Sequence, residues 1–189
     1  MDFNKELLLA SKSPRRQELI KSLGYPFSIC EIDVEEIYPE NLKGAEVAEF
    51  LSHLKASAYS LPLTDNQVVI SADTIVCLDD EILGKPKNTI EASEMLNQLS
   101  GRSHKVITGV TLMSSNDVLT FSEETKVTFK DLSQTEIDYY ISHYKPFDKA
   151  GSYGIQEWIG HIGITKMEGS YFNVVGLPIQ KIYQNLQSL

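Results

Sequence analysis

The sequence predicts an α/β fold in which helices flank a mixed β-sheet. Short apolar runs rich in β-branched residues alternate along the chain with segments whose apolar residues recur at helical spacing. The 189 residues are 42% hydrophobic and 23% charged, which is typical of a soluble globular chain long enough to bury a sizeable core. We therefore expect one domain over residues 1–189, or two closely packed lobes.

The first half of the chain predicts three strands and two helices. The first helix follows a proline and ends at Gly24, and the second is rich in alanine with apolar residues on one face. The third strand is rich in β-branched residues and is expected to end at Asp73. In order, these elements are strand Leu7–Ala10, helix Arg15–Leu23, strand Phe27–Ile32, helix Ala45–Leu61 and strand Gln67–Ala72.

The second half predicts two helices and a pair of strands. We expect a helix over Thr89–Leu99 and strands over Val106–Met113 and Leu119–Phe129, paired around a turn at 114–117. A helix over Gln134–Tyr144 begins with a serine and a glutamate at capping-box spacing. The segment Glu168–Pro178 is expected to form a tight turn followed by a buried strand.

Composition excludes several functional classes. The formal net charge of −9 argues against a general nucleic-acid binder, because a phosphate backbone would be repelled by most of the surface. Cys30 and Cys77 are too far apart for a metal motif and too few for a disulfide framework. No apolar run approaches the roughly 20 residues of a membrane span, and Leu7–Ala10 is too short for a signal peptide. We expect a cytoplasmic protein without a membrane segment.

The stretch "SKSPRR", residues 11–16, joins a predicted strand to a predicted helix. Free backbone N–H groups and the positive end of the helix dipole favour an anion there. The hydroxyls of Ser11 and Ser13 and the guanidiniums of Arg15 and Arg16 add donors that match phosphate oxygens. The alternative is a serine-capped helix whose arginines lie in water.

Carboxylates and lysines elsewhere in the sequence could act together with this candidate anion site. Asp73 follows a hydrophobic strand and could bind a divalent metal or accept a proton from water, although an Asx turn is the commoner role. Glu36 lies in the acidic run "DVEE" and could add a metal oxygen, unless the run is simply solvated. Lys55 and Lys85 add cations that would otherwise be ordinary surface lysines.

Gln156 lies in "KAGSYGIQEW", a stretch dense in small and polar residues. Its carboxamide offers both a donor and an acceptor, as recognition of a base edge requires. Cations for a polyphosphate, carboxylates for a metal and water, and an amide for a base together favour phosphoanhydride cleavage.

Over essentially its whole length, the sequence resembles the Maf-like nucleoside triphosphate pyrophosphatases. The shared motifs, in order, are "LASKSPRRQEL", "DVEE", the "KA" at 55–56, "SADTIV", "LGKP", "GRSHKVITGV", "DKAGSYGIQ" and "EGSYFNVVGLP". The resemblance implies a central cleft between two α/β lobes on an extended, bent sheet. It also implies metal-dependent hydrolysis of a nucleoside triphosphate to the monophosphate and pyrophosphate, with Mg²⁺, Mn²⁺ or Co²⁺ as the metal.

The resemblance also implies roles for individual residues. Asp73 matches the family's proton acceptor, and Arg15, Thr74 and Gln156 match its specificity positions. The remaining polar positions of the family's cleft correspond to Ser11, Arg16, Glu36, Lys55 and Lys85. The "GIQ" at 154–156 is similar to that of the branch that acts on dTTP and UTP, and modified pyrimidine nucleotides are further candidate substrates.

We therefore expect four cations and the hydroxyls of Ser11 and Ser13 to bind the triphosphate; the cations are Arg15, Arg16, Lys55 and Lys85. Glu36 and Asp73 are expected to hold the metal. This sequence departs from the family pattern at Glu157 and Trp158, where members often have glycine directly after the glutamine, and at Lys12. Two rival hypotheses are a triphosphatase for deaminated purines and a nucleotide-binding regulator of cell division. The sequence leaves open whether the protein forms a homodimer.

Overall fold

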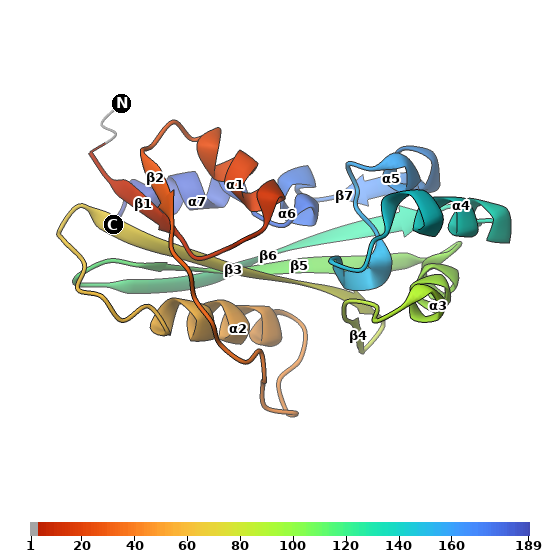
Figure 1. The fold of residues 1–189 in the computed structure, drawn as a ribbon, viewed down its shortest axis with the longest axis horizontal. Helices are drawn as coiled ribbons and strands as arrows, with labels where there is room; N and C mark the ends of the chain where they lie inside the picture. The colour runs from red at the N-terminus through yellow and green to blue at the C-terminus, as the bar shows by residue number, and fades with distance from the viewer. Residues whose placement is uncertain (1–3) are drawn as a thin grey trace. The chain divides into compact units, whose positions relative to one another are not determined.

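The computed structural model describes residues 4–189 and contains strands, helices and one 3₁₀ helix, η1 (Figure 1). The strands are β1 (Glu6–Leu9), β2 (Phe27–Ile29), β3 (Gln67–Leu78), β4 (Glu81–Leu83), β5 (Ser103–Met113), β6 (Val118–Phe129) and β7 (Ile164–Glu168). The helices are α1 (Pro14–Lys21), α2 (Ala45–Ser57), α3 (Thr89–Leu99), α4 (Gln134–Tyr144), η1 (Ala150–Ser152), α5 (Trp158–Gly163), α6 (Tyr171–Val175) and α7 (Ile179–Leu186).

The described residues form one seven-stranded mixed sheet, which confirms the predicted fold class. Its strand order is β2-β1-β3-β5-β6-β7, and β4 pairs with β3 off this path. Strand β1 lies parallel to β2 and β3, whereas β4 and β7 pair antiparallel with β3 and β6. The chain divides into two compact units: unit 1 holds the described residues up to 74 with 108–123 and 176–189, and unit 2 holds 75–107 and 124–175.

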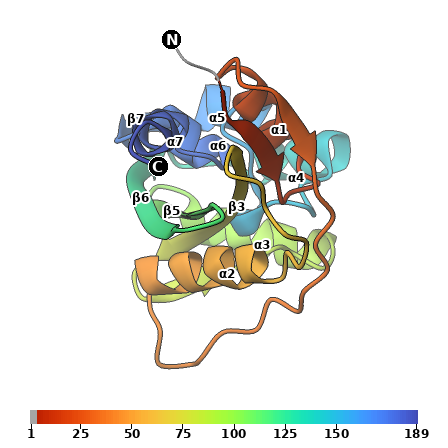
Figure 2. The same ribbon diagram turned by 90° about the vertical axis from the view of Figure 1, so that its left-hand side faces the viewer.

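Unit 1 is layered, with helices on both faces of its strands. Helix α2 covers one face, and α1 and α7 cover the opposite face (Figures 1 and 2). In β1, Leu7 and Leu9 belong to a core cluster that includes Ile20 of α1 and Ile182 of α7, while Leu8 belongs to a separate cluster. Successive side chains of a strand point to opposite faces, so a strand covered on both faces must be apolar throughout.

Helix α2 lies very close to the sheet because β5 has a glycine beneath it. A Cβ atom added at Gly109 would lie only 2.2 Å from the carbonyl carbon of Ala48 in α2. On the same helix, the Ser52 hydroxyl is 3.0 Å from that of Thr111 in β5, and the carbonyl of Ser52 accepts a hydrogen bond from Ser71 Oγ at 2.6 Å. These contacts fix the height of α2 above the sheet one turn before Lys55.

Unit 2 has its own core, in which α3 packs against α4 and η1. Its largest fully buried side chains include Leu96 of α3, Phe129 of β6 and Tyr140 of α4. Helix α4 begins with the predicted capping box: Ser133 Oγ accepts from the Glu136 N–H at 3.3 Å, and the Glu136 carboxylate accepts from the Ser133 N–H at 2.8 Å.

Two local predictions are wrong. Strand β3 continues through Asp73 to Leu78, because the following "TIVCL" is β-branched or apolar and almost all of it is buried. The segment after Gly169 forms α6 and leads into α7 rather than a buried strand. A short apolar run does not distinguish helix from strand, and the tertiary contacts of Asn173, whose side chain donates to the carbonyl of Val106 at 3.0 Å, favour the helix.

Candidate active site

The turn between β1 and α1 presents serine hydroxyls and backbone N–H groups together. Ser11 Oγ accepts a hydrogen bond from the N–H of Ser13 at 3.3 Å, and Pro14 begins the helix. Ser13 is the N-cap residue, yet among residues 4–189 its side chain makes no capping hydrogen bond. The structure therefore does not show the side-chain cap that the alternative predicts, and the positive end of the α1 dipole lies at this turn.

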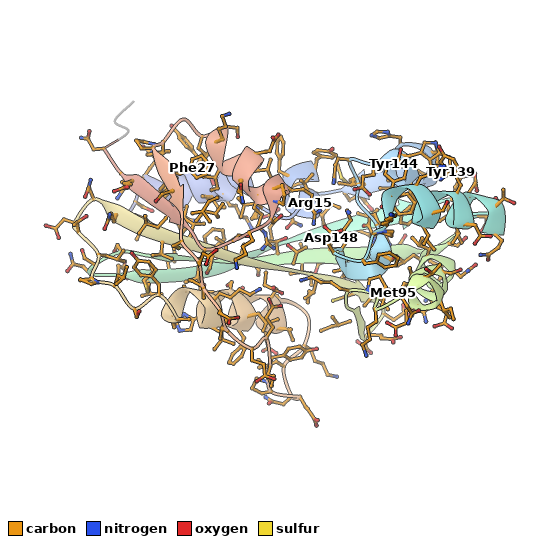
Figure 3. The ribbon with its side chains drawn as sticks, in the orientation of Figure 1. Arg15, Phe27, Met95, Tyr139, Tyr144 and Asp148 are labelled. Atoms are coloured by element: carbon orange, nitrogen blue, oxygen red, sulfur yellow. The ribbon has the colours of Figure 1, made fainter. Side chains whose placement is uncertain are left out.

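The two neighbouring arginines have different environments. Arg15 is half-buried on the first turn of α1 (Figure 3). The guanidinium of Arg16 donates three hydrogen bonds within unit 1: Nε to the carbonyl of Gly176 at 2.8 Å, Nη1 to the carbonyl of Ala72 at 2.8 Å and Nη2 to Thr74 Oγ1 at 3.0 Å. Burial lowers the pKa of Arg16, and the nearby charge of Asp73 opposes that shift.

Three of the predicted residues meet in unit 1. The ammonium of Lys55 is 2.5 Å from Asp73 Oδ1 and 2.9 Å from Glu36 Oε1. The side chains of Lys55 and Asp73 are 13% and 12% exposed, whereas that of Glu36 is 46% exposed. One cation thus lies between two carboxylates at the point where the buried part of the cluster meets solvent.

Separate elements bring these three residues together. Asp73 lies within β3, Lys55 lies in the last turn of α2, and Glu36 lies in the loop between β2 and α2. Because the buried carboxylate of Asp73 has Lys55 as a partner, a charged residue is tolerated inside an otherwise apolar strand. The sequence predicts the three residue types, but only the packing of α2 on the sheet shows that they are neighbours.

The carboxylates of Glu36 and Asp73 fit a divalent metal in number and chemistry. Both bind the same ammonium, so their oxygens already converge on one cationic centre. Across residues 4–189 no group of three or more acidic, histidine or cysteine side chains is arranged to hold a metal ion. A pair of carboxylates suits Mg²⁺, which is commonly held by one or two carboxylates together with substrate phosphates.

Thr74 does not present an isolated hydroxyl. In addition to accepting from Arg16, its Oγ1 lies 2.9 Å from the hydroxyl of Thr108 and 3.4 Å from the carbonyl of Gly176.

Lys12, where the first motif departs from the family pattern, forms an exposed ion pair with Glu31 at 3.6 Å.

The remaining two predicted residues belong to unit 2. Lys85 is exposed in the segment after β4. Gln156 is half-buried, and its Oε1 is a buried oxygen that has no hydrogen-bond partner in the described chain. An unpartnered buried acceptor is costly unless a ligand or water supplies a donor, so this carboxamide is a candidate recognition group.

A buried polar network, which the sequence did not predict, anchors the turn that carries Gln156. The hydroxyl of Tyr140 donates to the carboxylate of Glu157 and accepts from the N–H of Gly154 at 3.0 Å. Lys149, which is 8% exposed, lies 3.1 Å from Glu157 and 2.8 Å from Asp148. Burial, followed by the hydrogen bond to Glu157, raises the pKa of Tyr140.

Residues around this turn pack on aromatic rings. Trp158 lies against Tyr139 of α4, which Figure 3 labels, with their ring centroids 4.7 Å apart.

His104 is buried in β5; its Nε2 is 2.7 Å from the hydroxyl of Tyr153, and its ring stacks on Phe129 with the ring centroids 5.6 Å apart. Burial lowers the pKa of His104 to about 4. We conclude that this histidine is a neutral core residue of unit 2.

No helix within residues 4–189 combines the length and the hydropathy that crossing a membrane requires.

Comparisons with known proteins agree with these observations. The family model described as "Maf-like protein" matches residues 6–189. The dTTP/UTP pyrophosphatase of Phocaeicola vulgatus is 50% identical over 97% of this chain and 96% of its own length. That of Flavobacterium johnsoniae is 49% identical over 97% of this chain and 95% of its own length. The Staphylococcus aureus Ham1 protein has a similar fold, with a TM-score of 0.57 at 17% identity, covering 97% of this chain and 99% of its own. The chain belongs to the Maf-like protein family.

Proposed function

We propose that the protein is a nucleoside triphosphate pyrophosphatase that hydrolyses dTTP and UTP to the monophosphate and pyrophosphate. The cluster of Asp73, Lys55 and Glu36 carries the proposal, because it combines a proton acceptor, a phosphate-binding cation and paired metal-binding carboxylates. Relatives that carry the dTTP/UTP pyrophosphatase name and are about half identical over nearly the full length support it.

The cations neutralise the triphosphate. Ser11, Ser13 and the first N–H groups of α1 supply donors at the turn before Arg15, and Lys55 supplies a charge beside Asp73. Such fixed donors stabilise the negative charge that develops on the phosphates in the transition state. Lys85 stays a predicted phosphate-binding cation.

Asp73 accepts the proton of the attacking water. Lys55 binds Oδ1, so we assign the proton-accepting role to Oδ2. The water oxygen forms a bond to the α-phosphorus as the bond from this phosphorus to the bridging oxygen breaks, and pyrophosphate leaves with the electron pair. A divalent metal held by Glu36 and Asp73 would neutralise phosphate charge and polarise the phosphorus–oxygen bonds.

Gln156 recognises the pyrimidine. Its carboxamide can both donate and accept, and its Oε1 is a buried acceptor without a partner in the part of the chain described. Thr74 stays a predicted specificity residue. A Gln156→Glu variant replaces the donor with a carboxylate oxygen and should lose selectivity for dTTP and UTP over other nucleotides. An unchanged substrate profile would remove Gln156 from base recognition.

A substrate panel scored by pyrophosphate release tests the activity. The panel contains dTTP, UTP, the other common triphosphates, modified pyrimidine triphosphates and ITP, each with Mg²⁺, Mn²⁺ or Co²⁺. The highest kcat/KM is expected with dTTP and UTP, and turnover should stop with EDTA. Preference for ITP would instead favour a triphosphatase for deaminated purines, and nucleotide binding without pyrophosphate release would favour a regulator.

The variant Asp73→Asn tests the assigned proton acceptor. It preserves shape but removes the base, so kcat should fall by about 100-fold or more. Asp79→Asn is the matched control, because Asp79 is exposed and pairs with Arg102 at the surface. Equal turnover by wild type and Asp73→Asn would refute the assignment. Cytoplasmic location and a dimeric state stay predictions, which cell fractionation and sedimentation would test.

A further inference from the structure

Arg16 donates hydrogen bonds to both sequence neighbours of Asp73. Its Nη1 donates to the carbonyl of Ala72, the residue before Asp73, and its Nη2 donates to the hydroxyl of Thr74, the residue after it. Its Nε donates to the carbonyl of Gly176, where the chain re-enters unit 1. A single planar guanidinium therefore connects α1, β3 and the C-terminal segment.

Arg16 binds the carbonyl of Ala72 just beyond the last backbone hydrogen bond between the parallel strands β1 and β3. The carbonyl of Ile70 accepts from the N–H of Ala10 at 2.8 Å, at the end of β1. The carbonyl of Ala72 points to the same edge of β3 because carbonyl directions alternate along a strand. The chain turns away after Ala10, so no β1 residue follows to pair with Ala72, and Arg16 satisfies this carbonyl at 2.8 Å.

The strand is also held from its two faces at this point. Successive side chains of β3 alternate, so Asp73 and Thr74 point to opposite faces. Asp73 meets Lys55 of α2, and Thr74 meets Arg16 of α1. Helices α2 and α1 cover opposite faces of the strands of unit 1 (Figures 1 and 2).

We propose that Arg16 is a positioning residue that fixes β3 at Ala72 and Thr74 and thereby aims the Asp73 carboxylate, rather than a ligand of the triphosphate. The inference rests on the proposed function, because it concerns the residue that takes the proton. The proposal rests on a geometry that only arginine provides. The three acceptors lie in different directions and match the planar fork of guanidinium donors, whereas the ammonium of a lysine cannot reach all three.

Kinetics of Arg16→Lys and Arg16→Gln separate the two roles. A residue that aims Asp73 affects the chemical step, so kcat should fall by at least about tenfold while KM for dTTP stays within about twofold. Lysine should not restore the rate. A phosphate ligand would instead raise KM in Arg16→Gln, and Arg16→Lys would recover most of the lost affinity; that pattern would overturn the proposal.

Arg102→Gln provides the matched control. Arg102 is partly exposed, pairs with Asp79 at the surface and lies in unit 2, so this variant should keep wild-type kcat and KM. Circular dichroism and thermal unfolding establish that each variant folds. If both Arg16 variants fail to fold, Arg16 is a general structural residue and the specific role assigned to it is overturned.

Amide hydrogen exchange tests the same geometry without catalysis. In Arg16→Lys, the amides of residues 72–75 should exchange faster than in wild type, while those of α4 in unit 2 should not change. Unchanged exchange at 72–75 would overturn the proposal even if activity falls. If wild type releases no pyrophosphate from any nucleotide of the panel, the proposed function fails, whereas the exchange result still decides whether Arg16 fixes this strand.

Discussion

Acid should destabilise the protein through His104. Burial lowers the pKa of this histidine from 6.5 to about 4, because the charged imidazolium is disfavoured beside Phe129 and Tyr153. The unfolded chain takes up the proton near pH 6.5, whereas the folded chain resists it until about pH 4. The stabilisation is therefore fully present above pH 6.5 and is lost progressively as the pH falls toward 4.

The difference between these two pKa values sets the size of the effect. At 1.36 kcal/mol per pH unit, it corresponds to about 3 kcal/mol of unfolding free energy lost between neutral pH and pH 4. The double variant His104→Phe/Tyr153→Phe removes the titrating ring and also the hydroxyl that would lose its partner. This variant should lack about 3 kcal/mol of the wild-type acid sensitivity, whatever its stability at neutral pH.

Urea denaturation at pH 7.5, 6, 5 and 4, followed by fluorescence, measures these free energies. Carboxylates contribute equally to the acid sensitivity of wild type and variant, so the difference between the two curves reports His104. The control is His161→Gln, which alters an exposed histidine. Parallel pH profiles for wild type and the double variant would refute the reasoning.

Three further perturbations have defined outcomes. Gly109→Ala should lower the unfolding free energy by about 1–3 kcal/mol and reduce the rate of pyrophosphate release, because the new methyl overlaps the backbone at Ala48 and displaces α2. Glu157→Gln should cost about 2 kcal/mol, because it removes a charged partner of the buried Lys149, and should also weaken dTTP selectivity. Ser133→Ala should cost about 1 kcal/mol without changing activity, because it removes only a helix cap.

Each of these has a matched control. Gly84→Ala places its methyl where no described atom lies within 4 Å and should leave stability nearly unchanged. Glu168→Gln breaks an exposed pair with Lys166 and should shift stability by less than about 1 kcal/mol. For the cap, Ser133→Asp restores an acceptor and should recover most of the lost stability. A variant that behaves like its control would contradict the assigned contact.

The predicted fold succeeds where local patterns are strong. Helices α3 and α4 have the predicted bounds, because apolar spacing and, at Ser133, a capping box mark their limits. Strand β3 runs past the predicted end because a carboxylate in a strand is a turn signal in sequence, and Lys55, which makes it tolerable, is 18 residues away. The short elements β4, α5 and α6 depend on tertiary packing that no local window contains.

For the candidate site, the sequence predicts residue types, whereas their arrangement comes from the structure. The sequence named Asp73, Glu36 and Lys55, and the structure brings these three together. The family resemblance gave Arg15 a specificity role and Arg16 a place among the remaining polar positions, but two adjacent arginines on one helix turn give no local signal of how their environments differ. Their difference arises from carbonyls that the fold brings to Arg16, one of them 160 residues away along the chain.

The division of the chain also has a consequence for synthesis on the ribosome. The chain passes between the units after residues 74, 107, 123 and 175, and the first three passages fall within β3, β5 and β6. Unit 2 is complete once residue 175 has been made. Unit 1, in contrast, needs α7, whose Ile182 and Leu186 belong to its core. Unit 1 therefore begins before unit 2 but can bury its core only after unit 2 has been made, so its apolar surface stays exposed for longer during synthesis.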